Sequence, residues 1–252
     1  MLGLKKFLFM GGSATALSAD LRTALDTWRA QPAPDLGEVH FHTRYVVIDI
    51  TCSGTNVEQD QLLSIAASTI RQAMITPEDS LFIDFTDSDD DAAVNRKLVT
   101  FLQFVAKAPV VTYNVAFVST FLQHACKTRL GIDFQPAWVD LAWMLPSLFK
   151  DKSSSIKPLD QWLEALGMPL GNGRRSLMDN TLLIARIFQM LLARAKEQDI
   201  HTASQLIEES RASMALRRHH YTQRYGKKHR REKQVFSALK SFAFPASAQV
   251  IS

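Results

Sequence analysis

The first residue that could do chemistry is Asp49, a carboxylate near the end of a buried, apolar run. It stands in RYVVIDITCSGTNVEQDQLLSIAAS, residues 44–68, where the pattern predicts a strand over Tyr45–Ile50, a polar loop and a second apolar strand. A carboxylate in this setting is typical of a metal-site strand followed by a hairpin. Two residues later, however, Thr51 offers only a neutral hydroxyl where a second carboxylate would complete a site for a divalent cation.

Composition predicts a folded chain with no membrane span. The 252 residues are 46% hydrophobic, which suits one domain of about 150–200 residues with appendages. The net charge of +4 points only mildly to an anionic partner. Cys52 and Cys126 have neither zinc spacing nor a disulfide framework, so a reducing, cytoplasmic location is expected. The apolar run Phe7–Met10 is too short to favour a signal peptide.

The hydrophobic pattern predicts an α/β domain with a mixed sheet. Strands are expected at 45–50, 61–70, 80–85 and 109–113 and near Val139, and helices at 92–106, 114–129, 141–149, 159–166 and 177–195. Three successive strands followed by strand–helix alternation imply a mixed sheet with helices on its faces. The predicted division is a helical N-terminal extension and linker at 1–40, the domain at 41–197, and a basic, mostly helical extension at 198–252, in which residues 201–240 form a separate unit.

The C-terminal extension concentrates the positive charge. Between Arg211 and Lys233 there are nine Lys or Arg residues and one acid, Glu232. A solvated helix would explain this equally well, but Tyr221 and Tyr225 interleave with the charges, as in an arm that contacts phosphates and stacks on bases. The candidate nucleic-acid-binding residues of this arm are Arg217, Arg218, Arg224, Lys227, Lys228, Arg230 and Arg231.

Four segments, in order, carry a family resemblance. They are VVIDITCSGTNVEQDQLLSIAAS, VVTYNVAFVSTFLQHA, WVDLAWMLPSLF and LEALGMPLGNGRRSLMDNTLLIARIFQML. They resemble motifs of the DnaQ-like 3′–5′ exonucleases, the proofreading epsilon-subunit type of the DEDD superfamily, over residues 40–195. The resemblance implies a ribonuclease-H-like, five-stranded mixed sheet with helices on both faces, and two-metal hydrolysis of phosphodiesters with Mg²⁺ or Mn²⁺. It also implies nucleic acid, a single strand or a 3′ end, as the partner.

The resemblance implies five chemical positions, of which two keep the family's residue. The first and last acids match Asp49 and Asp179, the expected weak metal ligands. The second acid falls on Thr51, the third on Val118, and the general-base histidine on Arg174. Two carboxylates and a guanidinium balance a pair of divalent cations poorly, and arginine cannot act as a base. The domain is therefore expected to bind nucleic acid but to cut it poorly or not at all, without a tightly bound ion.

Arg174 has three readings. It could pair with Asp49 or Asp179 in place of the metal, contact a backbone phosphate through its fork of donors, or point to solvent. The ion pair is the favoured expectation.

The remaining candidates have structural explanations that we favour. Asn114 and Asp140 are predicted to cap helices, and Asp60 to order the hairpin loop. Nothing near Cys52 suggests an activated thiolate. Structural or surface roles are also expected for His124, His219, His220, His229, Trp138, Trp143 and Trp162.

Two other functions stay open. The first is an active, metal-dependent exonuclease with a reorganised site, which would need Asp140 or Glu58 to move in as a ligand. The second is a protein-interaction scaffold without a nucleic-acid role, with a protein partner docked on the helical ends at 1–30 and 201–240. The sequence does not distinguish DNA from RNA.

Overall fold

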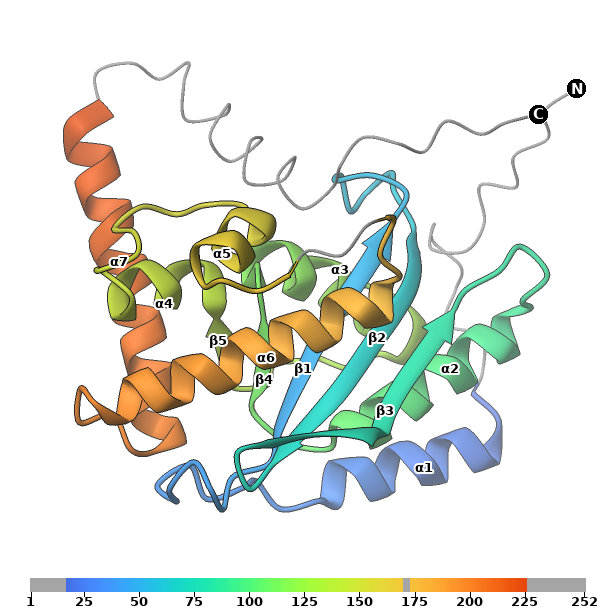
Figure 1. Ribbon diagram of the computed structural model, residues 1–252. Helices are drawn as coiled ribbons and strands as arrows, with labels where there is room; N and C mark the ends of the chain where they lie inside the picture. The colour runs from blue at the N-terminus through green and yellow to red at the C-terminus, as the bar shows by residue number, and fades with distance from the viewer. Residues whose placement is uncertain (1–16, 170–172, 226–252) are drawn as a thin grey trace, which may run out of the picture.

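Five strands form one mixed sheet in the computed structural model (Figure 1). The model describes the backbone of residues 17–169 and 173–225, and side chains as far as Ala215. The sheet order is β3-β2-β1-β4-β5, where the strands are β1 Tyr45–Cys52, β2 Leu62–Arg71, β3 Met74–Asp84, β4 Val110–Thr112 and β5 Trp138–Asp140.

Strand direction decides where the functional edge lies. β2 is antiparallel to both β1 and β3, whereas β4 runs parallel to β1 and β5 parallel to β4. The carboxyl ends of β1, β4 and β5 therefore meet at one edge of the sheet, where α/β proteins place their ligands. This is the ribonuclease-H-like arrangement, and the predicted fold class is confirmed.

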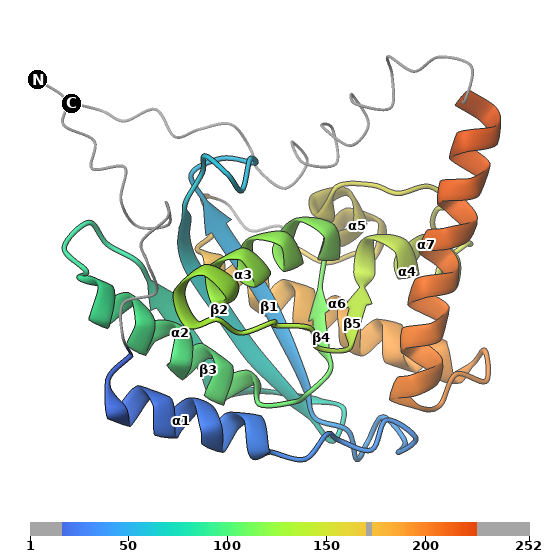
Figure 2. The same cartoon turned by 180° about the vertical axis from the view of Figure 1, so that it is seen from behind.

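Helices cover both faces of the sheet. Figure 2 shows one layer, made of α1 (Ala19–Ala30), α2 (Asp91–Val105) and α3 (Val115–Leu130). On the other face lie α4 (Leu141–Leu148), α5 (Leu159–Ala165), α6 (Leu177–Lys196) and the start of α7 (Ala203–Tyr225).

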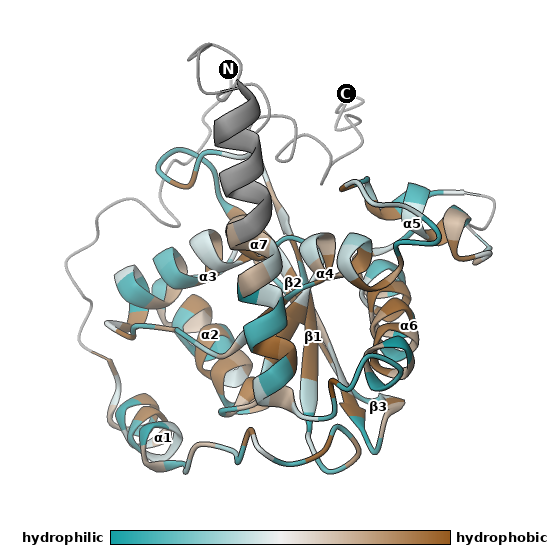
Figure 3. Cartoon of the chain, turned by 90° about the vertical axis from the view of Figure 1, so that its left-hand side faces the viewer, coloured by the Kyte–Doolittle hydropathy of each residue, from teal (hydrophilic) through white to brown (hydrophobic). Residues whose placement is uncertain are grey.

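Alternation along β1 builds the two cores. Val46 and Ile48 pack into the first layer, while Tyr45 and Val47 pack into the second, and all four are fully buried. Figure 3 shows hydrophobic residues concentrated on the central strands between the helical layers. None of the helices in the described part of the chain has the length and apolarity that crossing a bilayer requires.

One predicted strand was placed too late. β3 begins at Met74 rather than Ser80, because the chain reverses at once through Gln72 and Ala73 and pairs immediately with β2. Residues 77–79 lie at an irregularity within the strand, where the pairing with β2 shifts register.

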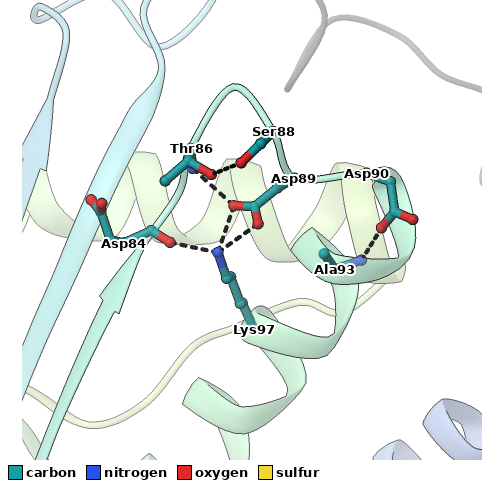
Figure 4. A network of polar contacts seen from close by, with 7 residues as sticks. All are labelled: Asp84, Thr86, Ser88, Asp89, Asp90, Ala93 and Lys97. Atoms are coloured by element: carbon teal, nitrogen blue, oxygen red, sulfur yellow. Dashed lines mark hydrogen bonds and ion pairs between the residues drawn. The ribbon is translucent and has the colours of Figure 1, made fainter.

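The acidic turn before α2 supplies the N-terminal cap of this helix. Asp90 Oδ1 accepts a hydrogen bond from the Ala93 N–H at 2.6 Å. Beside it, Lys97 Nζ donates to both carboxylate oxygens of Asp89 and to the Asp84 carbonyl (Figure 4). The network ties the end of β3 to the first turns of α2.

The start of the C-terminal extension packs on the domain, whereas the sequence suggested that residues 201–240 form a separate unit. Ala203, Leu206 and Ile207 at the start of α7 are buried in the second core. Ser147 Oγ also donates to Glu209 Oε1 at 2.8 Å, which ties α7 to α4. The predicted domain boundaries stay a prediction, but the first turns of α7 pack as part of the globular unit.

Candidate functional site

The candidate site lies where the sheet's carboxyl edge meets helix N-termini. Asp49 is near the end of β1, Asn114 follows β4, and Asp140 ends β5. Figures 1 and 2 place the start of α6, which carries Asp179, beside the same end of β1. The topology therefore gathers the first and last predicted acids at one edge.

Asp49 is a half-buried carboxyl without a positive partner among the described residues. The Ile50 N–H donates to its Oδ1 at 3.0 Å, and its neighbours Ile48 and Ile50 are buried. Burial raises the pKa of Asp49 to about 7, against the weaker, opposing effect of the Ile50 hydrogen bond. A substantial fraction of this side chain therefore keeps its proton near neutral pH.

The raised pKa predicts a pH dependence of stability. Between about pH 4 and pH 7 the folded chain keeps the Asp49 proton and the unfolded chain loses it. The free energy of unfolding therefore falls as pH rises through this window, by up to ~1.4 kcal/mol per pH unit. Asp49→Asn mimics the neutral acid, so this variant should gain stability relative to wild type as pH rises. Urea unfolding from pH 4 to pH 8 measures the difference, and a difference that ignores pH would contradict the raised pKa.

The two substituted acid positions supply no charge. Thr51 is half-buried and alternates onto the same side of β1 as Asp49. Val118, in the first turn of α3, is 2% exposed and belongs to the first core. Asn114 begins this helix and accepts the Phe117 N–H at its Oδ1 at 3.2 Å, which confirms the predicted cap.

Asp179 is held within the first turn of its own helix. Its Oδ2 accepts both the Ser176 N–H at 2.9 Å and the Ser176 hydroxyl at 2.7 Å, and its N–H donates to Ser176 Oγ. These hydrogen bonds lower the pKa of the exposed Asp179 carboxyl. Ser176 and Asp179 thus form a capping box. Its sequence signal is a serine followed three residues later by an acid, and the prediction of Asp179 as a metal ligand did not take this signal into account.

The expected ion pair of Arg174 is wrong. Arg174 is exposed, and within the described residues it pairs with neither Asp49 nor Asp179. The arginine that does form a pair is its neighbour Arg175, with Asp160. Arg174 therefore faces solvent, and its contact with a backbone phosphate stays a prediction.

Asp140 joins two helices at the centre of the edge. It is 2% exposed; its Oδ1 accepts the Ala142 N–H and its Oδ2 the Val115 N–H, both at 3.0 Å. The predicted cap of α4 is confirmed, and Asp140 caps α3 as well. Its own N–H donates to Ser210 Oγ of α7 at 3.0 Å. With both oxygens engaged, Asp140 is placed as a structural link rather than as a replacement metal ligand.

The hairpin loop after β1 is ordered by Asp60, as predicted. Asp60 Oδ2 accepts the Asn56 N–H at 2.7 Å, and Oδ1 accepts the Ser53 hydroxyl at 3.3 Å. A Cβ atom at Gly54 would clash with the Asp60 carboxylate, so this close approach favours glycine. Glu58, the other replacement ligand considered, is exposed in this loop, where its N–H donates to Asn56 Oδ1.

The basic arm falls largely outside the described residues. The backbone of α7 extends to Tyr225, but its side chains are described only as far as Ala215. Side-chain positions are therefore not described for Arg217, Arg218, Arg224, Lys227, Lys228, Arg230, Arg231, His219, His220 or His229. Their role stays a prediction.

The donor set does not fit a pair of Mg²⁺ or Mn²⁺ ions. Two-metal sites need several carboxylates around both ions. Of the family's four acid positions, only Asp49 and Asp179 carry a carboxylate here, and that of Asp179 is engaged in the α6 cap. The other two positions offer the hydroxyl of Thr51 and the isopropyl group of the buried Val118. Among the described residues, no group of three or more His, Cys, Asp or Glu side chains is arranged to hold a metal ion.

Comparisons with known proteins place this geometry in context. No family model matches the chain. The PolC-type DNA polymerases III of Thermotoga petrophila and Thermotoga maritima are each 25% identical to it over 178 residues, which cover 64% of this chain. The predicted resemblance to the DnaQ-like exonucleases is confirmed as a resemblance. The match spans only 13% of the length of either polymerase.

Solved structures show a more distant likeness. The nuclease domain of 3′hExo, a DEDDh family member bound to rAMP, aligns with a TM-score of 0.48 and 17% identity over 62% of this chain and 94% of the other. Exonuclease I of E. coli in complex with a dT13 oligonucleotide aligns with a TM-score of 0.43 and 14% identity, over 62% and 42%. These values are too low to bear on activity.

Proposed function

We propose that this DnaQ-like domain binds nucleic acid at the carboxyl edge of its sheet and is impaired in hydrolysis. The observation that supports this proposal best is the isolation of Asp49. It is a half-buried carboxyl whose pKa is raised by burial, without a second carboxylate two residues on and without a positive partner in the described chain.

Electrostatics supports the loss of catalysis. Two divalent cations bring a charge of +4, and Asp49 with Asp179 would offset at most half of it. Two unit charges 4 Å apart interact by about 4 kcal/mol at an effective dielectric of 20, so each missing carboxylate weakens cation binding appreciably. The family's general base is also absent, because arginine stays protonated. A positioned base typically contributes 10²–10⁴-fold to a rate.

The relatives and the charge distribution support nucleic acid as the ligand. The similar sequences are DNA polymerases by name, and the predicted basic arm follows, in the sequence, the residues of α7 that pack on the domain. Three exposed cations form no ion pair among the described residues and add to the positive potential, namely Arg174, Lys150 and Lys152. Phosphate contacts by such groups give affinity without requiring chemistry.

The test is the salt dependence of binding to a labelled single strand. Affinity should fall linearly with the logarithm of salt concentration. Changing Arg217, Arg218 and Arg224 together to glutamine should lower the slope by about 2, at roughly 0.7 per phosphate contact on a single strand. Fluorescence anisotropy at several salt concentrations measures both.

Arg22, Arg29 and Arg96, changed together to glutamine, form the matched control, because they are exposed on α1 and α2 away from this edge. This triple variant should bind like wild type. No binding by wild type, or affinity indifferent to salt, would refute the proposal and favour a protein-interaction scaffold.

A further inference from the structure

A second surface lies at the opposite end of β1 from Asp49. It is a cavity of about 550 Å³ lined by residues 41–44 on one side and by Arg71, Gln72, Met74 and Thr76 on the other. We call it the hairpin groove, since it borders the β2–β3 turn. Figures 1 and 2 show the 41–44 segment and this turn together at the end of the sheet away from the β1 arrowhead. Independently of the proposed function, we propose that the hairpin groove docks a peptide segment of a partner protein that carries an apolar side chain beside an acidic one.

The groove displays apolar side chains that the fold leaves uncovered. Phe41 is 53% exposed and Met74 is 61% exposed, and both line it. Val39, another large hydrophobic residue that is exposed, lies two residues before Phe41 in the chain. Aromatic residues, methionine and arginine are the types enriched at protein interfaces, and this groove combines all three.

Two fixed cations border the apolar patch. Arg44 donates to the Phe104 carbonyl at 2.8 Å and to the Val105 carbonyl at 3.2 Å, and it lies over the Phe104 ring. Its buried Nε has no hydrogen-bond partner among the described residues. Arg71 is 57% exposed and contacts Asp79 Oδ2 through Nε, at 3.4 Å.

The charge balance favours an acidic ligand. None of the eight lining residues is acidic, so a carboxylate entering the groove meets the two arginines first. Asp79 offsets part of the charge of Arg71 but also accepts the Thr69 hydroxyl, and Glu38 faces His42. Arginine recognises carboxylates through paired, parallel donors, and the contact of Arg71 with Asp79, at 3.4 Å, is longer than a charge-assisted hydrogen bond.

The border of the groove is preorganised at a conformational cost. Gln72 and Ala73 have φ values of +52° and +58°, a left-handed turn that normally uses asparagine and glycine. Gln189 Nε2 of α6 holds this turn by donating to the Ala73 carbonyl at 2.8 Å. Backbone strain of this kind collects at functional sites and ligand clamps, and a rigid border lowers the entropy lost on binding.

The size of the cavity selects a short segment as the occupant. About 550 Å³ lies within the range of pockets that enclose a small ligand or a few side chains. Apolar anchors surrounded by polar groups are how peptide segments are usually held. One apolar side chain of the peptide would pack between Phe41 and Met74, and an adjacent acidic side chain would pair with Arg71.

The experiment selects random peptides of about twelve residues, displayed on phage, against the full chain. Enriched peptides should share an acidic residue next to an apolar one. By fluorescence polarisation, Phe41→Ala and Arg71→Glu should each weaken them at least about tenfold. Phe82→Ala and Arg96→Glu are matched controls, exposed outside the groove, and should leave affinity unchanged. Replacing the peptide's acid with lysine should restore binding to Arg71→Glu.

Four results would overturn the proposal. They are the absence of enriched peptides, a consensus without an acid, binding that the groove variants do not affect, and a dimer in solution that Phe41→Ala dissociates. The last would make a second copy of the chain the occupant.

Discussion

Replacing Asp140 with alanine should lower the free energy of unfolding by about 3–5 kcal/mol. The carboxylate is 2% exposed and accepts N–H groups from the first turns of both α3 and α4. Hydrogen bonds to a charged group contribute about 1.5–3 kcal/mol each, and removing the acceptor leaves both donors unsatisfied. Urea unfolding followed by circular dichroism measures the loss.

Two further variants separate the double cap from a general effect of truncation. Asp140→Asn keeps one acceptor oxygen and should lose about half as much stability. Asp90→Ala removes one exposed cap, on α2, and should cost only about 1 kcal/mol. If Asp140→Ala cost no more than Asp90→Ala, Asp140 would not be the link between the helices.

Restoring the missing chemical groups should restore hydrolysis. The variant Thr51→Glu, Val118→Asp, Arg174→His returns two acids and a base to the carboxyl edge. It should degrade a labelled single strand in Mn²⁺ at least about 10²-fold faster than wild type. Val118 is 2% exposed, so the new carboxylate should destabilise the chain until metal binds, and Mn²⁺ should then raise Tm.

Adding Asp49→Asn to this triple variant controls for a contaminating nuclease and for metal bound at another site. Adding this change should return the rate to that of wild type, because the restored site depends on the first acid. Wild type that already cuts as fast as the restored variant, and loses that activity with Asp49→Asn, would contradict impairment.

Much of the sheet could be predicted because its residues leave few alternatives. The apolar residues from Val46 to Ile48 and at Val110 and Val111 are β-branched and typical of buried strands, and Asn114 and Asp140 are typical helix caps. The start of β3 was not predicted, because Pro77 and Glu78 are uncommon inside strands, although an edge strand paired with β2 tolerates them.

The details of the site depend on contacts that spacing does not reveal. Asp140 caps α3 from 25 residues away because β4 and β5 are neighbours in the sheet. Arg174 and Arg175 are equivalent in sequence, and only the fold shows that Arg175 is the one beside Asp160. Likewise, the hydrogen bond between the buried Ser210 and the Asp140 N–H joins α7 to the domain. The residues around Ser210 and Asp140 in the sequence do not predict this contact.

The central claim is that the carboxyl edge lacks the charge to hold two divalent cations. Electron paramagnetic resonance of free Mn²⁺, titrated into wild type and into the Thr51→Glu, Val118→Asp, Arg174→His variant, tests it directly. We expect the restored variant to remove ions from solution at ion concentrations close to that of the protein, in an amount that Asp49→Asn reduces, while wild type leaves the free signal unchanged. Two ions bound per wild-type chain, lost with Asp49→Asn, would contradict the account.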